Sequence, residues 1–445
     1  MKKFIETLKN IWSIEELRSK IIVTLALLAV YRLGTHIALP GIDPNKLPTG
    51  GAGTGILGLI DAFAGGAFSQ ASILALGIMP YISASIFMQL LTILYPPFQK
   101  MQKEGASGQK KINQYTRYLT VAVTALQASA YVAYLNSPGY KEAIIPAYEP
   151  FFWLSTTILL TAGTLFVMWL GEKITDKGLG NGASVIIMVG ILARLPQSLQ
   201  QEWISKANRG GGGLLIFVIE IAILVAVIMG LIVLIQGVRK IPVQYAKQIV
   251  GNRQFGGARQ FLPVKVNSSG VMPIIFAQAI MFLPTLLSNF ETTQGLSKIF
   301  NDHTNVWYMI IYGIMVVAFT FLYTALIFNP KQIADDLKRN NGFIPGVKPG
   351  QPTVDYIGSI MDKITLPGAI LLAVVGILPG FAQRLGVAQG FSYFYGGTSL
   401  LIMVGVILDT LQQIETQLLM RQYDGLMKSG RLQGRQGQAM TTSSM

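Results

Sequence analysis

Cysteine is missing from the sequence, histidine occurs only twice, and charged residues make up 13% of the 445 positions. Without cysteine, disulfides, thiolate catalysis and cysteine-bound metals are excluded. His36 and His303 lie near the ends of apolar segments, so single polar residues in loops explain them better than a metal pair does. The sequence also has no phosphate-binding GxxxxGK[ST] loop, no HExxH motif and no plausible catalytic triad. It therefore predicts neither an enzyme nor a bound cofactor.

Charged residues are also rare within the apolar segments, where Arg32, Glu220 and Asp409 are the main candidates. An ion-coupled pump ordinarily keeps several buried carboxylates or histidines along its path. A voltage sensor needs a periodic series of arginines, which this chain does not have. If the chain forms a pathway, the sequence predicts one that is apolar or weakly polar.

Long apolar runs make up much of the sequence, and 51% of its residues are hydrophobic. An average soluble domain has about 25% charged residues, so the composition indicates an all-α, polytopic membrane protein. Two groups of five spans would have opposite orientations, as in inverted repeats, but the two groups share too little sequence to establish this. We expect ten transmembrane helices, at approximately residues 20–37, 72–95, 116–136, 151–171, 183–200, 213–237, 270–289, 306–328, 364–383 and 394–418.

The second predicted span contains a proline. Pro80 lacks a backbone donor and frees the carbonyl group of Leu76, so we expect a kinked helix. The kink either borders a cavity or is purely structural.

Positive charges are distributed unevenly between the predicted loops. The net charge is +14, and 27 of the 35 lysines and arginines lie on one side of the predicted spans, against seven on the other. Because positive loops stay in the cytoplasm, both termini and the loops 238–265 and 329–363 are expected there, with residues 1–19 as an amphipathic surface helix. Attraction to anionic lipids explains part of this charge. The length of the two loops, and their proline and glycine residues, indicate in addition a docking surface for a large, negatively charged partner.

One apolar stretch, residues 56–70, fits neither a loop nor a span. As a helix it would be roughly 22 Å long, against a hydrocarbon core of about 30 Å. It contains Asp61 and the pair Gly65-Gly66, and a predicted span follows it directly.

Six motifs follow one another between Ala71 and Asp409, within a resemblance that runs from the first span to about Tyr423. They are ASILALGIMPYISASIFMQLLT, EGASGQKKINQYTRYLT, TLFVMWLGEKITDKGLGNGASVII, LPVKVNSSGVMPIIFA, FLYTALIFNPKQIADDLK and YFYGGTSLLIMVGVILD. With these motifs the chain resembles the SecY family of bacterial protein-export channels. The resemblance implies a clamshell of two pseudo-symmetric inverted halves, residues 20–200 and 213–418, around an hourglass pore, with residues 419–445 as a cytoplasmic tail.

The same resemblance implies a plug and a pore ring. Residues 56–70 would form a short plug helix in the external funnel, where water would tolerate a charge and two glycines would offer a flexible joint. A narrow ring of apolar side chains would exclude water and block ions. The plug residues are Ile56, Leu59, Asp61, Phe63, Gly65, Gly66 and Phe68, and the pore-ring residues are Ile78, Ile82, Ile187, Ile275 and Ile402.

A lateral gate and a docking site are also implied. Weak polar contacts among Ser83, Gln127 and Asn267 would keep the gate closed until an apolar signal peptide inserts. The docking residues for a motor or the ribosome are Arg239, Lys240, Arg253, Lys338, Arg339, Lys348 and Tyr423. At Lys348 this sequence has a lysine where the family's usual PGxRPG motif has an arginine. Lysine keeps the positive charge but loses the two-pronged hydrogen-bonding geometry of arginine.

The implied function is a channel that translocates unfolded secretory proteins across the bacterial cytoplasmic membrane and releases transmembrane segments sideways into lipid. The implied partners are small SecE- and SecG-type membrane subunits, the SecA ATPase motor, the ribosome, signal peptides, unfolded polypeptides and anionic lipids. The alternatives are a secondary transporter for a small solute and a structural scaffold. A transporter would need charged groups at a mid-membrane site and would not need a plug.

Overall fold

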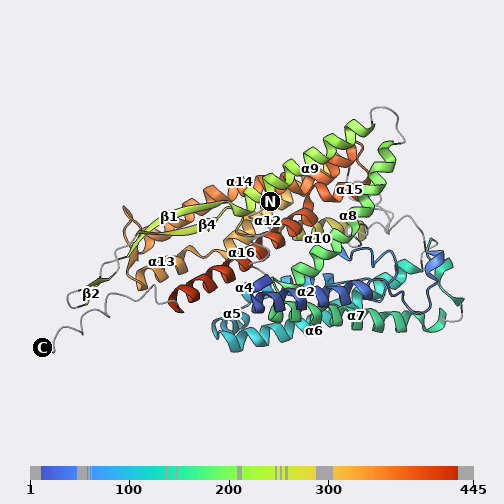
Figure 1. Ribbon diagram of the computed structural model, residues 1–445, viewed down its shortest axis with the longest axis horizontal. Helices are drawn as coiled ribbons and strands as arrows, with labels where there is room; N and C mark the ends of the chain where they lie inside the picture. The colour runs from blue at the N-terminus through green and yellow to red at the C-terminus, as the bar shows by residue number, and fades with distance from the viewer. Residues whose placement is uncertain are drawn as a thin grey trace.

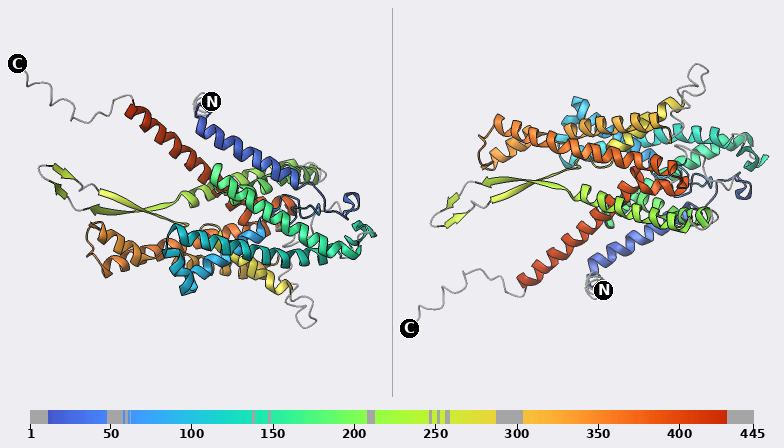
Figure 2. Two further views of the ribbon diagram at one scale, coloured as in Figure 1. Left: turned by 90° about the horizontal axis from the view of Figure 1, so that it is seen from below. Right: turned by 90° about the horizontal axis from the view of Figure 1, so that it is seen from above.

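The computed structural model describes residues 12–47, 58, 61, 63–136, 139–146, 149–207, 213–245, 248–250, 253–255, 259–286 and 304–428. Long helices form a bundle, and one β-hairpin projects from an end of it (Figures 1 and 2). The helices before residue 208 are α2 (Glu15–Gly34), α4 (Met79–Leu94), α5 (Pro96–Lys103), α6 (Ala106–Leu135), α7 (Glu149–Lys177) and α8 (Gly182–Ala207). Those after residue 212 are α9 (Gly213–Gln236), α10 (Met272–Leu286), α12 (Val306–Ile327), α13 (Pro330–Arg339), α14 (Gln351–Arg384), α15 (Gln389–Ser392) and α16 (Gly397–Lys428).

Several of these helices are suited to a membrane. In the described part of the chain, seven helices are long and apolar enough to cross one, and the bent pair α4–α5 makes up to eight. The prediction of a multi-pass helical membrane protein is confirmed. Helices α2 and α10 coincide with the first and seventh predicted spans but are not among the seven, and α10 has only 15 residues. The total of ten spans therefore stays a prediction.

The second predicted span begins later than hydropathy indicates. Residues 71–78 form turns, with Gly77 at φ +55°, and helix α4 starts at Met79 with Pro80 in its first turn. The first turn of a helix has no internal partner for its N–H groups, so a proline there disrupts nothing. The expectation of a kink at Pro80 is wrong, because this proline begins the helix.

The basic segment 238–265 is a β-hairpin, whereas the sequence predicted a structured loop. Strands β1 (Val238–Tyr245) and β4 (Arg259–Lys265) pair in antiparallel fashion, and β5 (Gly342–Phe343) extends the sheet to the order β4-β1-β5. The short strands β2 (Gln248–Val250) and β3 (Arg253–Phe255) pair with each other beyond them. Buried Ile241 and Val264 pack with Leu337 of α13 and Ile357 of α14, which fixes the hairpin to both helices.

Three apolar clusters hold the bundle together. One lies within the earlier helices and includes Phe68 and Tyr131, and another lies within the later helices and includes Ile274 and Leu372. The third, here called the central cluster, contains residues of α7, α8, α15 and α16 together with Phe63. Helices from both parts of the chain therefore meet in one apolar core.

Candidate functional site at the centre of the bundle

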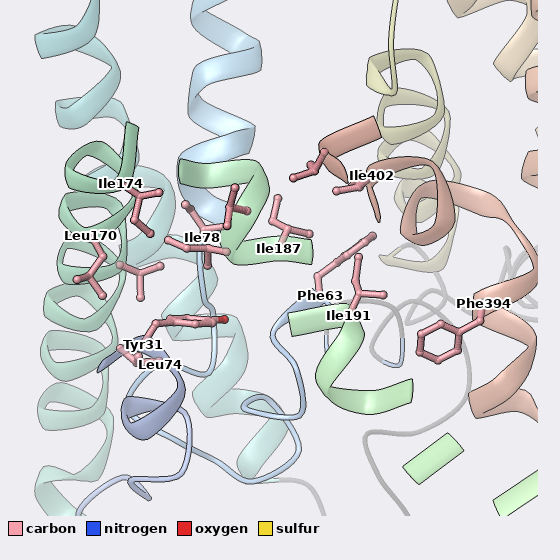
Figure 3. Packing of buried hydrophobic residues seen from close by; sticks show 14 of the residues in the cluster. Tyr31, Phe63, Leu74, Ile78, Leu170, Ile174, Ile187, Ile191, Phe394 and Ile402 are labelled. Atoms are coloured by element: carbon pink, nitrogen blue, oxygen red, sulfur yellow. The ribbon is translucent and has the colours of Figure 1, made fainter. Parts of the chain in front are cut away.

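The central cluster contains most of the predicted pore ring. Ile78, Ile187 and Ile402 are buried members, exposed by 4%, 5% and 8%, and Ile82 packs against them. Ile82 N donates to Ile78 O over 3.1 Å, so the first turn of α4 brings both side chains to one face. Figure 3 shows Ile187 between Ile78 and Ile402. The structure thus brings Ile78 and Ile82, which are neighbours at the start of α4, together with Ile187 of α8 and Ile402 of α16, which lie far from them in the sequence.

Ile275, the fifth predicted ring residue, lies elsewhere. It is half-buried on α10 and is not among the described members of the central cluster. Its neighbour Ile274 is fully buried in the cluster of the later helices. The structure therefore does not join Ile275 to the other four isoleucines.

The predicted plug is only partly described, since Ile56 and Leu59 lie outside the described residues. The part that the structure shows, Asp61 and residues 63–70, is here called the plug segment. Phe63 belongs to the central cluster and lies beside Ile191 in Figure 3. Gly65 and Gly66 have φ values of +65° and +94°, which favour glycine. The segment is a packed turn, and its Phe63 shares the central cluster with the four isoleucines.

Asp61 is fully buried, which contradicts the expectation that water in a funnel would surround it. It forms an ion pair with Arg194 of α8, and its Oδ1 accepts a hydrogen bond from Ser69 N over 2.8 Å. A charged carboxylate away from water needs such partners, because its desolvation is costly. The structure therefore places Asp61 inside a polar contact rather than in solvent.

Three further hydrogen bonds reach the plug segment from neighbouring helices. Arg32 Nη1 of α2 donates to Gly65 O over 2.9 Å, and Tyr131 Oη of α6 donates to Phe68 O over 2.7 Å. Arg194 Nη2 donates to Ser69 Oγ over 3.0 Å. The sequence did not predict these roles: Arg32 was expected to be an isolated intramembrane charge, and Arg194 was one of the seven lysines and arginines counted on the less basic side. An arginine within an apolar segment was the available signal, since such a group must find partners.

The predicted lateral-gate residues do not contact one another through hydrogen bonds in the described structure. Ser83 Oγ donates to Met79 O of its own helix over 3.1 Å. Asn267, in the turn between β4 and α10, accepts from Ser269 Oγ over 3.4 Å. Gln127 is half-buried on α6. Their gating role stays a prediction.

Most of the predicted docking residues gather at one end of the molecule. Arg239 and Lys240 are exposed on β1, and Lys338 and Arg339 are exposed at the end of α13. Lys348 is exposed in the turn before α14. Strands β1 and β4 and helix α13 lie together at this end, toward which the last turns of α16 also point (Figures 1 and 2). Two further docking residues are placed only by their elements, Arg253 in β3 and Tyr423 in α16.

A second buried charge cluster, which the sequence analysis did not predict, joins α8 to α9. Lys206 Nζ lies 3.3 Å from Glu202 Oε1 and 2.7 Å from Glu220 Oε1, and all three side chains are buried. Lys206 also donates to Gly386 O over 3.0 Å, and Glu202 accepts from Ala388 N over 2.7 Å. The signs in the sequence were the spacing of Glu202 and Lys206, four residues apart on one helix, and the position of Glu220 within an apolar segment.

Together, the fold and the site define a helical membrane protein whose two groups of helices meet at an apolar core with a folded segment packed against it. The SecY family model matches residues 72–411. The protein translocase subunit SecY of Streptomyces galbus is 41% identical over 434 residues, which cover 93% of this chain and 97% of that protein. The SecY subunit of Chlamydia muridarum (strain MoPn / Nigg) is 40% identical over 455 residues, covering 96% and 99%. The chain belongs to the SecY family of protein translocase subunits.

Solved structures share the fold. A protein-conducting channel superposes with a TM-score of 0.62 at 16% identity, covering 90% of this chain and 92% of that one. A SecY structure whose plug domain is described as stabilising the closed state gives 0.58 at 17% identity, with coverages of 90% and 92%. Sec61 from a canine ribosome-channel complex gives 0.59 at 14% identity, again with 90% and 92%.

Family membership confirms the predicted fold class and the function as a non-enzymatic protein translocase subunit. Neither the family match nor these relatives support a small-solute transporter.

Proposed function

We propose that the central cluster is the constriction of a polypeptide-conducting pore and that residues 56–70 are the plug that closes it. The observation that carries this proposal is the position of Phe63. It comes from the plug segment, yet it packs in one cluster with Ile187 of α8 and Ile402 of α16. Helices from both parts of the chain and the plug segment thus contribute side chains to the same apolar cluster.

Isoleucine suits such a constriction for a physical reason. A narrow apolar ring offers no ligand to an ion and loses its water, so it blocks leakage. It also offers no hydrogen bonds that would retain one particular sequence, so unrelated unfolded chains can pass. In our proposal Ile275 completes the ring on α10, in a state of the channel in which α10 has moved closer.

We further propose that residues 20–200 and 213–418 form the two halves of the channel and that a gate toward the lipid lies between them. Ser83, Gln127 and Asn267 are its polar residues. An apolar signal peptide would enter lipid through this gate, driven by about 25 cal/mol per Å² of buried apolar surface. Because no hydrogen bond joins the three side chains within the described structure, little polar contact would have to break.

In this proposal the energy for translocation comes from a partner, and further partners surround the channel in the membrane. The exposed basic residues of β1, α13 and the turn at Lys348 form a surface for the ribosome or a SecA-type motor, and a ribosome-bound channel is among the proteins with this fold. SecE- and SecG-type subunits, signal peptides and anionic lipids complete the set. The membrane is the bacterial cytoplasmic membrane, with both termini in the cytoplasm, as the distribution of lysine and arginine indicates.

Deleting residues 56–70 tests the plug. We expect a higher ion conductance across planar bilayers that contain the purified channel with its partner subunits. Deleting residues 431–445, a segment of equal length outside the proposed pore, is the control and should leave the conductance unchanged. A plug deletion that conducts no more than the control would contradict the proposal.

A further inference from the structure

The plug segment is held by two arginines from different helices, Arg32 on α2 and Arg194 on α8. We propose that both are positioning residues for the closed plug, and that the ion pair between Arg194 and Asp61 is the contact that must break before the plug leaves. This inference rests on the proposed plug function and names the residues that control it.

Arg194 contacts the plug segment at two residues, Asp61 and Ser69. Its guanidinium group pairs with Asp61 and donates to Ser69 Oγ over 3.0 Å, while Ser69 N donates to Asp61 over 2.8 Å. Asp61 and Ser69 are separated along the chain but adjacent in this contact. Arg194 therefore stabilises the folded shape of the segment as well as its position.

Arg32 fixes the middle of the same segment. It donates to Gly65 O, and a Cβ atom added at Gly65 would lie only 2.9 Å from Arg32 Nη1 and from Gly190 Cα. At Gly190 an added Cβ would lie 2.4 Å from Phe63 O. The absence of side chains at both glycines lets the plug segment touch α8 directly, within reach of both arginines.

Among the described residues, the polar anchors of the plug segment lie on the earlier helices α2, α6 and α8. The described link of the segment to α16 is apolar, since Phe63 shares the central cluster with Ile402. If the earlier and later helices separate, Phe63 loses its packing with α16, but the ion pair between Asp61 and Arg194 remains. Release of the plug is therefore a second step, and the ion pair determines its free energy.

The two charges of this pair differ in burial, which makes the test specific. Asp61 is fully buried, whereas the side chain of Arg194 is 26% exposed. Arg194→Gln leaves a buried carboxylate without its counter-charge, so it should destabilise the closed plug strongly. Asp61→Asn leaves an arginine that can still reach water, so its effect should be smaller.

The experiment measures ion leak in planar bilayers that contain the channel and its partner subunits, without a translocating substrate. We expect Arg194→Gln to raise the leak on the order of tenfold and Asp61→Asn to raise it less. Adding Asp61→Asn to Arg194→Gln should lower the leak again, because it removes the unpaired charge. The control is Lys46→Gln, which removes the same charge from an exposed site and should change nothing.

A second measurement does not depend on conductance. Because the chain has no cysteine, Ala67→Cys introduces a single thiol at a fully buried position of the plug segment. A membrane-impermeant maleimide should label it faster in the Arg194→Gln background than in the Lys46→Gln background. Equal labelling and equal leak in these two backgrounds would overturn the assignment of Arg194 and of its ion pair with Asp61. If deletion of residues 56–70 still raised the leak, the plug itself would stand, whereas an unaltered leak after that deletion would remove the proposed function as well.

Discussion

Ile187 obtains its proposed role from its position, because a buried isoleucine in an apolar helix is otherwise an ordinary packing residue. It is 5% exposed and lies between Ile78 and Ile402, which come from α4 and α16 (Figure 3). The sequence alone cannot distinguish it from its neighbour Ile186, which is equally apolar and is 1% exposed. Both isoleucines are members of the central cluster, and only the resemblance to the SecY family assigns the proposed ring position to Ile187 rather than to Ile186.

Replacing Ile187 with lysine should raise the ion leak of the channel. A charged side chain in the constriction retains water and gives ions a favourable path. Ile275→Lys is the variant for comparison, since it makes the same change at the proposed ring residue that lies outside the central cluster in this structure. Bilayer conductance should rise more for Ile187→Lys. A larger rise for Ile275→Lys would show that the working constriction is not the cluster described here.

The pairing of Asp61 with Arg194 illustrates what residue-level reasoning cannot supply. The two residues lie far apart in the sequence, and each alone is compatible with a solvated loop. Their contact depends on how the plug segment folds against α8, a tertiary feature that no local spacing encodes. The type of residue did contain a partial signal for Arg32, because a charge inside an apolar helix requires a partner.

At the scale of elements, apolar runs predicted where spans exist better than where they begin. Hydropathy averages composition over a window, so the apolar residues 72–78 were joined to α4 although they form turns. The β-hairpin was missed for a related reason. In the sequence, the segments 238–245 and 259–265 are conspicuous for their charge, whereas the alternation of buried and exposed residues in β1 depends on packing against α13 and α14.

The buried charge cluster of α8 and α9 should contribute strongly to stability. Lys206→Met leaves Glu202 and Glu220 buried without their counter-charge, and removing one partner of a buried pair costs about 3–5 kcal/mol. Arg117→Met is the control, since it breaks the exposed pair of Arg117 with Glu172, a type of pair worth about 0.2–1 kcal/mol. Thermal unfolding in detergent should show a clearly larger loss for Lys206→Met. Equal losses would mean that water reaches Glu202 and Glu220 and replaces the interactions that Lys206 provides.

At the scale of the whole molecule, the distribution of charge predicted more than the boundaries of single elements did. Counting lysines and arginines placed segments 238–265 and 329–363 on the same side, and the structure brings β1, β4 and α13 to one end of the bundle (Figure 2). The meeting of two groups of helices at one apolar cluster could not be predicted from hydropathy. Lipid-facing and pore-facing isoleucines have the same composition, and only packing separates them.

Neutralising two charges at this end should weaken binding to ribosomes. Lys338 and Arg339 are exposed at the end of α13, where they can displace counterions from RNA phosphates. For the variant Lys338→Gln with Arg339→Gln, the slope of log affinity against log salt should fall in magnitude by about 1.4–1.8, since each phosphate contact contributes about 0.7–0.9. Lys46→Gln with Lys141→Gln removes the same net charge from exposed sites that we predict to face the other side of the membrane, so both affinity and slope should be retained. Titration of ribosomes onto reconstituted channel at several salt concentrations measures both quantities. If the control pair lowered the slope as much as the α13 pair did, binding would depend on the net charge of the whole molecule rather than on this surface.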